Sequence, residues 1–253
     1  MQIIPLPAFN DNYIWLLRAG SHAAVVDPGD AAPVLRYLAE HGLALTAILV
    51  THHHPDHVAG IEALTAAHPV PVFGPAMEDI LGLTHPVSQD DEVLLPELGV
   101  EFRVLDLPGH TAGHVGYYGE GCVFCGDTLF AAGCGRLFEG TPAQMYESLA
   151  ALAALPGDTQ VYCTHEYTLG NLKFAAAVEP ANPDIAARIA ACTAERAANR
   201  PTVPFPLSGE LKTNPFLRSS EPAVIRQAEA QAGHALVSPV EVFAAVREWK
   251  NRF

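Results

Sequence analysis

Short apolar runs closed by turn-forming residues recur through the first two thirds of the chain, and this pattern is typical of strands. The predicted strands are Gln2–Leu6, Tyr13–Leu17, Ala23–Val26, Ala47–Val50, Val70–Phe73, Val100–Leu107, Val115–Tyr118, Gly121–Cys125 and Gln160–Cys163. Apolar positions at helical spacing predict helices from Asp30 to Gly42, from about Val58 to Ala67 and from Pro142 to Leu152. Residues 74–98 are rich in Gly, Pro and Asp, and we expect them to be irregular.

The pattern changes after His165. Residues 169–200 are Ala-rich with helical spacing and a break at Asn182-Pro183, and residues 201–206 predict an extended linker. Two more helices are predicted over 221–232 and 239–250. We therefore expect a mixed α/β domain over residues 1–166 and a smaller helical domain over 167–253.

A cluster of imidazoles and a carboxylate, Thr51 to His57, directly follows a predicted strand. Histidine is the commonest protein ligand for metals such as zinc. In extended chain His52 and His54 point the same way, whereas the turn that Pro55 forces lets Asp56 and His57 face a different point. The cluster therefore predicts ligands for two adjacent metals, with a His-rich polar loop as the alternative.

Three further strand ends carry the same chemistry, at His110, Asp127 and His165. Small or turn-forming residues precede each of them, and sites in open α/β sheets gather at strand ends. We expect these side chains to join His52, His54, Asp56 and His57 in one metal site. His53 is expected to point away from it. His114 either supports the ligands or begins a strand, and we favour the second role.

Composition narrows the possible partners. The chain has 253 residues, 49% of them hydrophobic, which suffices for a sizeable core. Its net charge of −14 argues against binding to nucleic acid or to an anionic membrane. No signal peptide is evident, and no apolar run approaches the roughly 18 residues that span a bilayer. Five cysteines fit a reducing cytoplasm, and we interpret Cys122 and Cys125 as core thiols rather than a redox pair.

Eight motifs along nearly the whole chain resemble the metallo-β-lactamase superfamily, and within it they are most similar to the glyoxalase II family. They are Phe9–Trp15, Thr51–His57, Pro108–His114, Gly126–Phe130, Gly133–Arg136, Thr164–Tyr167, Asn171–Phe174 and Thr213–Arg218. The histidine motif is common to the superfamily, whereas the later motifs are closer to glyoxalase II. The resemblance implies an αββα sandwich with a C-terminal helical domain and a dinuclear site.

By position, the resemblance implies that His52, His54 and His110 hold one divalent metal. It implies that Asp56, His57 and His165 hold the second, with Asp127 bridging. We expect zinc, although iron and manganese accept the same ligands. No Ser-His-Asp or Cys-His arrangement is evident, so we expect a metal-bridging hydroxide, held by Asp56 and Asp127, to attack S-D-lactoylglutathione and release D-lactate and glutathione.

The resemblance also implies a glutathione site formed by Arg136, Tyr167, Arg247 and Lys250. Relatives can carry a Tyr where this chain has Phe138, so one hydroxyl contact with the substrate is absent. The alternative for Arg247 and Lys250 is ordinary surface near the end of the last helix, where cations suit the helix dipole.

Other functions remain open at this point. A mononuclear iron persulfide dioxygenase of the same superfamily would not need Asp56 and His57 as a second metal site. A non-catalytic metal-binding scaffold is the alternative outside enzymes. A β-lactamase is disfavoured because no export signal is evident, and a nuclease because the chain is acidic. We expect a cytoplasmic monomer that acts on a small molecule.

Overall fold

The computed structural model describes residues 1–253 and divides into two compact units. The first comprises residues 1–107 and 112–126, and the second residues 108–111 and 127–253. The short segment 108–111 therefore belongs to the second unit although its chain neighbours belong to the first.

Two groups of strands and three helices form the first unit. One sheet has the order β1-β2-β3-β4-β5-β6, and the strands of the other follow the order β10-β9-β8-β7. The strands are β1 (Gln2–Ala8), β2 (Asn12–Ala19), β3 (His22–Val26), β4 (Ala44–Leu49), β5 (Val72–Pro75), β6 (His85–Val87), β7 (Glu92–Leu95), β8 (Val100–Asp106), β9 (Val115–Gly119) and β10 (Cys122–Gly126). The helices are α1 (Ala31–His41), α2 (Pro55–Val58) and α3 (Ile61–Ala67).

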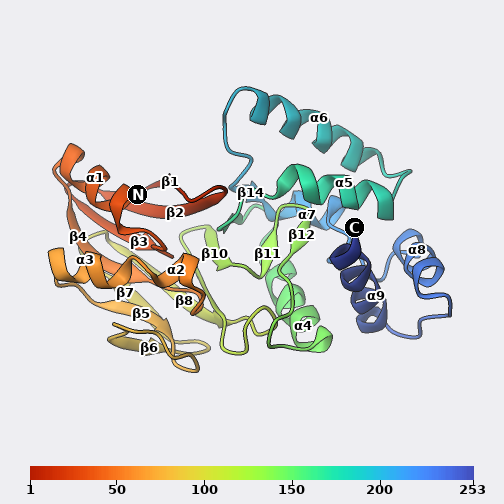
Figure 1. Cartoon of the computed structure of the whole chain (residues 1–253), viewed down its shortest axis with the longest axis horizontal. Coiled ribbons are helices and arrows are strands. Elements are labelled where there is room, and N and C mark those ends of the chain that lie inside the picture. The colour runs from red at the N-terminus through yellow and green to blue at the C-terminus, as the bar shows by residue number, and fades with distance from the viewer. The chain divides into compact units, whose positions relative to one another are not determined.

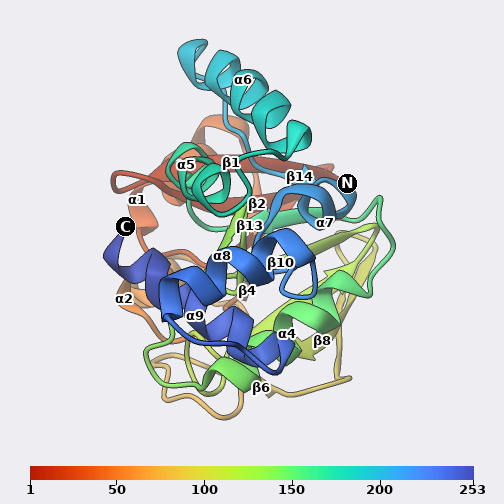
Figure 2. The same cartoon turned by 90° about the vertical axis from the view of Figure 1, so that its right-hand side faces the viewer.

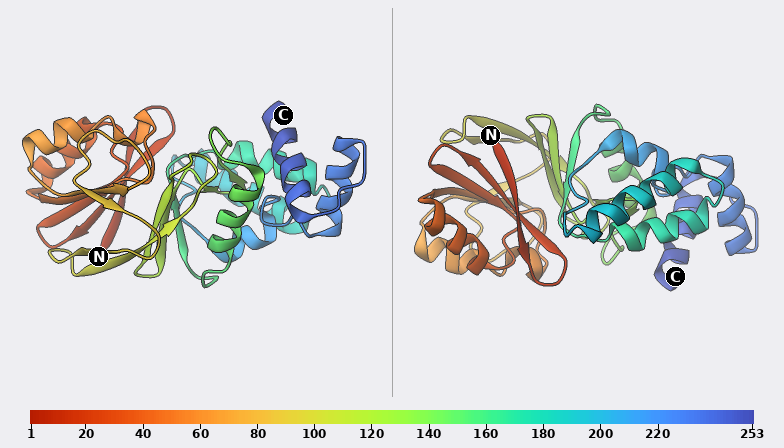
Figure 3. Two further views of the ribbon diagram at one scale, coloured as in Figure 1. Left: turned by 90° about the horizontal axis from the view of Figure 1, so that it is seen from below. Right: turned by 90° about the horizontal axis from the view of Figure 1, so that it is seen from above.

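Alternate side chains of β2 enter two different layers. Ile14 and Leu16 pack in one core with residues of α1 and α3, such as Val34. Trp15 and Leu17 are equally buried but lie outside that core, on the opposite face of the strand. In the right-hand view of Figure 3, the orange helices and the yellow-green strands lie on opposite sides of the red strands. The first unit is therefore a helix layer on one sheet, with the second sheet behind it.

Local signals predicted α1 correctly. The side chain of Asp30 accepts a hydrogen bond from the backbone N–H of Ala32, and Gly42 ends the helix with a φ of 61°. The helix predicted from Val58 is wrong in its start, because α2 already begins at Pro55 and a break at Gly60 separates it from α3. A Cβ at Gly60 would lie 2.4 Å from the carbonyl oxygen of Pro28, so this close approach requires glycine.

The segment 74–98 contradicts our prediction, because it contains β6 and β7. Strand β7 alternates exposed and buried residues, with Val93 and Leu95 inside, and pairs antiparallel with β8. Because β7 is short and turns flank it, the sequence pattern did not reveal this edge strand.

The second unit is mostly helical (Figure 2). Its strands are β11 (Leu129–Phe130), β12 (Gly133–Cys134), β13 (Gln160–Cys163) and β14 (Phe205–Pro206). Its helices are α4 (Pro142–Ala153), α5 (Thr168–Val178), α6 (Pro183–Ala197), α7 (Leu207–Thr213), α8 (Pro222–Ala232) and α9 (Pro239–Arg252). The expected opening at Thr141-Pro142 is confirmed by a capping box between Thr141 and Gln144. Helix α7 was not predicted.

Aromatic side chains from distant helices hold the second unit together. Phe174 of α5 stacks on Phe216 with ring centroids 6.1 Å apart, and Phe216 lies edge-on to Phe243 of α9 at 5.8 Å. All three rings are buried. Figure 1 shows the C-terminus of α9 next to the end of α5. This packing fixes the position of α9, which carries Arg247 and Lys250.

Candidate active site

The end of β4 presents His52 from a fully buried position. Asp27, which follows β3, accepts hydrogen bonds from the backbone N–H and the hydroxyl of Thr51, both at 2.8 Å. The same hydroxyl lies 3.0 Å from Nδ1 of His52. Because the hydroxyl proton is donated to Asp27, Nδ1 of His52 is the donor to this oxygen, and Nε2 carries the lone pair that binds metals.

Asp27 also makes an ion-pair contact with a second imidazole. Oδ2 of Asp27 lies 3.0 Å from Nδ1 of His57, so the lone pair of His57 is also on Nε2. That Nε2 lies 3.6 Å from Oδ2 of Asp56, which accepts a hydrogen bond from Asn12 at 3.0 Å. The expected turn at Pro55 is the first turn of α2, so Asp56 and His57 project from a helix rather than from a loop.

The remaining histidines of the cluster divide by direction. The rings of His54 and His57 lie 4.7 and 4.0 Å from the ring of His52, measured between centroids. His53 instead directs its Nδ1 to Glu78 at 2.9 Å, which confirms that it points away. His114 is buried, stacks on His52 at 4.8 Å and immediately precedes β9, so it both supports the cluster and begins a strand.

The second unit holds its own convergent group. Oδ2 of Asp127 lies 3.5 Å from Nε2 of His110 and 3.4 Å from Nε2 of His165. Nδ1 of His110 donates to the carbonyl oxygen of Arg136 at 2.8 Å, which again leaves the lone pair on Nε2.

These distances fit metal ligands. Two ligands held ~2.0–2.1 Å from one ion at tetrahedral angles are ~3.4 Å apart, longer than a good hydrogen bond. The Asp–His separations of 3.4–3.6 Å match that value in both units. Each unit thus contributes His and Asp side chains that can bind metal ions.

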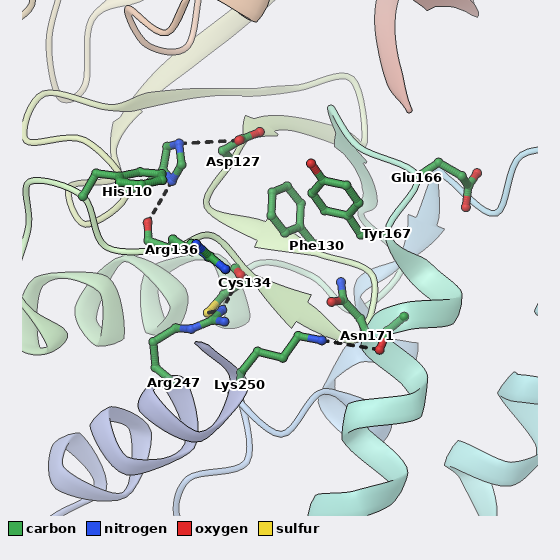
Figure 4. Close-up of a pocket in the computed structure, with 12 residues that line it drawn as sticks. His110, Asp127, Phe130, Cys134, Arg136, Glu166, Tyr167, Asn171, Arg247 and Lys250 are labelled. Carbon is green, nitrogen blue, oxygen red and sulfur yellow. Dashed lines mark hydrogen bonds and ion pairs between the residues drawn. The ribbon is translucent and has the colours of Figure 1, made fainter. Parts of the chain in front are cut away.

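A pocket of about 630 Å³ lies wholly within the second unit (Figure 4). All five residues expected to bind the substrate line it, together with the expected metal ligands His110 and Asp127 and five residues to which the sequence analysis gave no role. The lining residues are His110, Asp127, Phe130, Cys134, Arg136, Phe138, Glu166, Tyr167, Gly170, Asn171, Arg247 and Lys250. Asn171 lies one helical turn after Tyr167, a spacing that could have indicated it from the sequence.

The two cations of α9 that line the pocket, Arg247 and Lys250, have unusual surroundings. Arg247 is only 5% exposed, so the alternative of helix-end surface is wrong for it. Its Nη1 donates to the carbonyl oxygen of Cys134 at 2.8 Å, while its buried Nε has no hydrogen-bond partner. Nζ of Lys250 lies 3.4 Å from the carbonyl oxygen of Gly170, and neither cation pairs with a carboxylate. Burial, and next the charge of Arg247, lower the pKa of Lys250.

Aromatic rings complete the wall of the pocket. Tyr167 stacks on His165 with centroids 4.6 Å apart and planes within 3°. Phe138 lies edge-on to His110 at 5.3 Å and is 63% exposed, so its ring covers the imidazole from the solvent side.

Proteins of known identity match the whole chain. It is 56% identical to a hydroxyacylglutathione hydrolase of Alkalilimnicola ehrlichii, with 99% of both chains covered. It is 50% identical to the one of Nitrosomonas europaea, with 100% of this chain and 97% of the relative covered. The chain belongs to the hydroxyacylglutathione hydrolase family. Family models match residues 8–165 to the metallo-β-lactamase superfamily and residues 166–253 to the hydroxyacylglutathione hydrolase C-terminus.

Solved structures share the fold of this hydroxyacylglutathione hydrolase family member. ETHE1 from Myxococcus xanthus has a TM-score of 0.68 and 26% identity and covers 99% of this chain and 98% of its own. TTHA1623, solved in a di-iron-bound form, has a TM-score of 0.55 and 30% identity and covers 64% of this chain and 91% of its own. The expected fold class is therefore confirmed as a metallo-β-lactamase fold with a C-terminal helical segment. None of the helices is both long and apolar enough to cross a membrane.

Proposed function

We propose that this chain hydrolyses S-(2-hydroxyacyl)glutathione thioesters, with S-D-lactoylglutathione and water giving D-lactate and glutathione. Full-length relatives at 50–56% identity carry the name of this activity. The single observation that carries the proposal is the pair of cations, Arg247 and Lys250, in one pocket without a carboxylate partner. Such a pocket suits a ligand that brings its own carboxylates, as glutathione does.

The metal ligands that we propose are the seven His and Asp side chains named from the sequence. His52, His54 and His110 would hold one divalent ion, and Asp56, His57 and His165 the other, with Asp127 bridging. The imidazole and carboxylate donors suit zinc, and iron or manganese as well. When bound, the ions would act as Lewis acids on the thioester carbonyl and lower the pKa of water.

Two further steps, orientation of the attacking water and departure of the thiolate, do not depend on the metal ligands alone. Asp56, which accepts a hydrogen bond from Asn12, would orient the attacking water. The departing thiolate has a conjugate acid with a pKa of about 8.5, so it leaves without a strong general acid. The chain's own cysteines do not compete as nucleophiles. Cys122, Cys125, Cys134 and Cys163 are buried, and burial raises the pKa of Cys122 to about 12. Cys192 is half-buried, and burial raises its pKa as well.

Binding of the tripeptide falls to the pocket in the second unit. Arg247 would receive a glutathione carboxylate on its buried guanidinium, and Lys250 would add a second charge. Arg136 and the hydroxyl of Tyr167 are placed at the same pocket for the peptide part. Phe138 contributes a ring but no hydroxyl.

We further propose a cytoplasmic monomer whose partner is a small molecule, without nucleic acid or membrane. The net charge of −14 and the absence of any disulfide among the five cysteines support this setting. The helical segment 167–253 is proposed as the substrate-binding domain, and the metallo-β-lactamase-like segment 1–166 as the catalytic one.

The experiment is turnover of S-D-lactoylglutathione by purified protein of known metal content. We expect equal amounts of D-lactate and free thiol, no oxygen uptake, and loss of activity with a chelator that zinc restores. A persulfide dioxygenase would instead consume oxygen with a persulfide substrate. Metal binding without turnover of any thioester would favour the non-catalytic scaffold.

A further inference from the structure

The hairpin of β11 and β12 forms part of the pocket wall through Phe130 and Cys134. Its turn contains Ala132 with a φ of 54°, a left-handed conformation that alanine disfavours. Glycine or asparagine is the usual residue at such a position. The surrounding structure must therefore hold this turn in place.

A buried carboxylate does so. Glu210 of α7 is fully buried, and its Oε2 accepts a hydrogen bond from the backbone N–H of Ala132 at 2.8 Å. The same oxygen accepts from the side-chain amide of Asn214 at 2.9 Å. That amide also reaches the carbonyl oxygens of Phe130 at 3.2 Å and Gly133 at 2.9 Å. Glu210 and Asn214 thus hold the backbone on both sides of the turn.

An ion pair fixes the carboxylate itself. Oε1 of Glu210 pairs with Nη2 of Arg188 from α6. Nη1 of Arg188 donates to the hydroxyl of Thr213 at 2.6 Å. A charged acceptor makes stronger hydrogen bonds to backbone N–H groups than a neutral one does.

We propose that Glu210, together with Arg188, is a positioning residue for substrate binding. It acts through the β11–β12 hairpin, which holds Phe130 and Cys134 where they form the glutathione pocket, and this inference rests on the proposed function. The carbonyl oxygen of Cys134 is the acceptor for Arg247, so a displaced hairpin also displaces the cation that meets the substrate carboxylate.

A double variant separates an effect on the position of the hairpin from an effect on the stability of the fold. Glu210→Met alone leaves Arg188 as an unpaired and largely buried cation, which is expected to destabilise the fold. Glu210→Met/Arg188→Met removes both charges and restores much of the lost stability, but the N–H of Ala132 still lacks its acceptor. The affinity for S-methylglutathione, measured by calorimetry, should therefore stay reduced roughly ten- to hundredfold while the melting temperature recovers.

Two further variants sharpen the result. Glu210→Gln keeps one oxygen that can accept from Ala132, so it should retain affinity within a few fold of the wild type. The matched control is Glu179→Met/Arg218→Met, which removes a different ion pair of similar burial, with Glu179 4% and Arg218 18% exposed. That pair does not contact the hairpin, so affinity should not change.

The outcomes are distinguishable. If the Glu210→Met/Arg188→Met protein binds S-methylglutathione as tightly as the wild type, or if affinity follows melting temperature in all variants including the control, the inference is overturned. If the wild type binds S-methylglutathione but does not hydrolyse S-D-lactoylglutathione, the proposed activity fails while the positioning role stands. A wild type that does not bind S-methylglutathione overturns both.

Discussion

The histidine cluster of the first unit and the pocket of the second unit hold their polar side chains in opposite ways. In the cluster, the hydroxyl of Thr51 hydrogen-bonds Asp27 and Nδ1 of His52, and Asp27 makes a buried ion-pair contact with Nδ1 of His57. In the pocket, the guanidinium of Arg247 contacts one carbonyl oxygen and no carboxylate. Polar partners orient the side chains of the cluster, whereas the pocket retains positive charge for an anion to neutralise.

From this difference we infer that the cluster determines the reaction and the pocket determines the substrate. Neutral, oriented imidazoles suit metal chemistry on many substrates, as the common motif of the superfamily indicates. Unneutralised cations in a pocket select an anionic ligand.

The largest expected effect concerns Asp127. Asp127→Ala removes the carboxylate that lies within 3.5 Å of both His110 and His165. We expect loss of bound metal and a fall in kcat/KM of roughly a thousandfold or more, since a bound metal supplies several kcal/mol and each ~1.4 kcal/mol is tenfold. His53→Ala is the control, because His53 faces Glu78. Equal losses in the two variants would show that the cluster is wrongly divided.

A smaller effect is expected from the residue that orients the cluster. Asp27 has a φ of 52°, which asparagine tolerates, so Asp27→Asn should leave the backbone intact. An amide N–H that faces Nδ1 of His57 would repel the proton on that nitrogen. The proton would then favour Nε2, the nitrogen proposed to bind metal. Metal affinity should fall about ten- to hundredfold, measured by competition with a chromogenic chelator. Unchanged affinity would mean that Asp27 only stabilises the loop.

As pH rises, binding of an anionic ligand in the pocket should weaken at a lower pH than it would at a site with an ordinary lysine. Burial and the charge of Arg247 lower the pKa of Lys250, so its ammonium is lost as pH rises through a value below 10.5. Affinity for S-methylglutathione should then drop several-fold, and binding should take up protons there because an anion raises the lysine pKa again. The comparison is the same titration on Lys250→Met, which should lack this transition. Identical profiles would remove Lys250 from ligand binding.

The smallest effect concerns Phe138. Phe138→Tyr adds the hydroxyl that relatives can carry, at the edge of the pocket. A hydrogen bond there is worth ~0.5–1.5 kcal/mol, and the exposure of the ring favours the lower end. KM for S-D-lactoylglutathione should fall about twofold with kcat unchanged. A higher KM would mean that the bare ring packs against the substrate.

Local signals in the sequence predicted helix α1 and the strand ends that carry the proposed metal ligands, because both depend on neighbouring residues. The break at Gly60 could not be predicted in this way, since its cause is the distant carbonyl of Pro28. The same holds for the pocket wall, where Glu210, distant in sequence, accepts a hydrogen bond from the turn between the two-residue strands β11 and β12. Burial of Arg247 depends on α9 packing on Phe216, with the guanidinium 5.0 Å from the ring centroid.

The most direct test of the division is the kinetics of Arg247→Ala/Lys250→Ala on two substrates, S-D-lactoylglutathione and a small uncharged thioester. Charged contacts of this kind are worth roughly 1.5–3 kcal/mol, so KM for the glutathione thioester should rise about ten- to a hundredfold. Its kcat should change much less, and kcat/KM for the uncharged thioester should stay near the wild-type value. An unchanged KM for the glutathione thioester, or an equal loss on both substrates, would contradict the account.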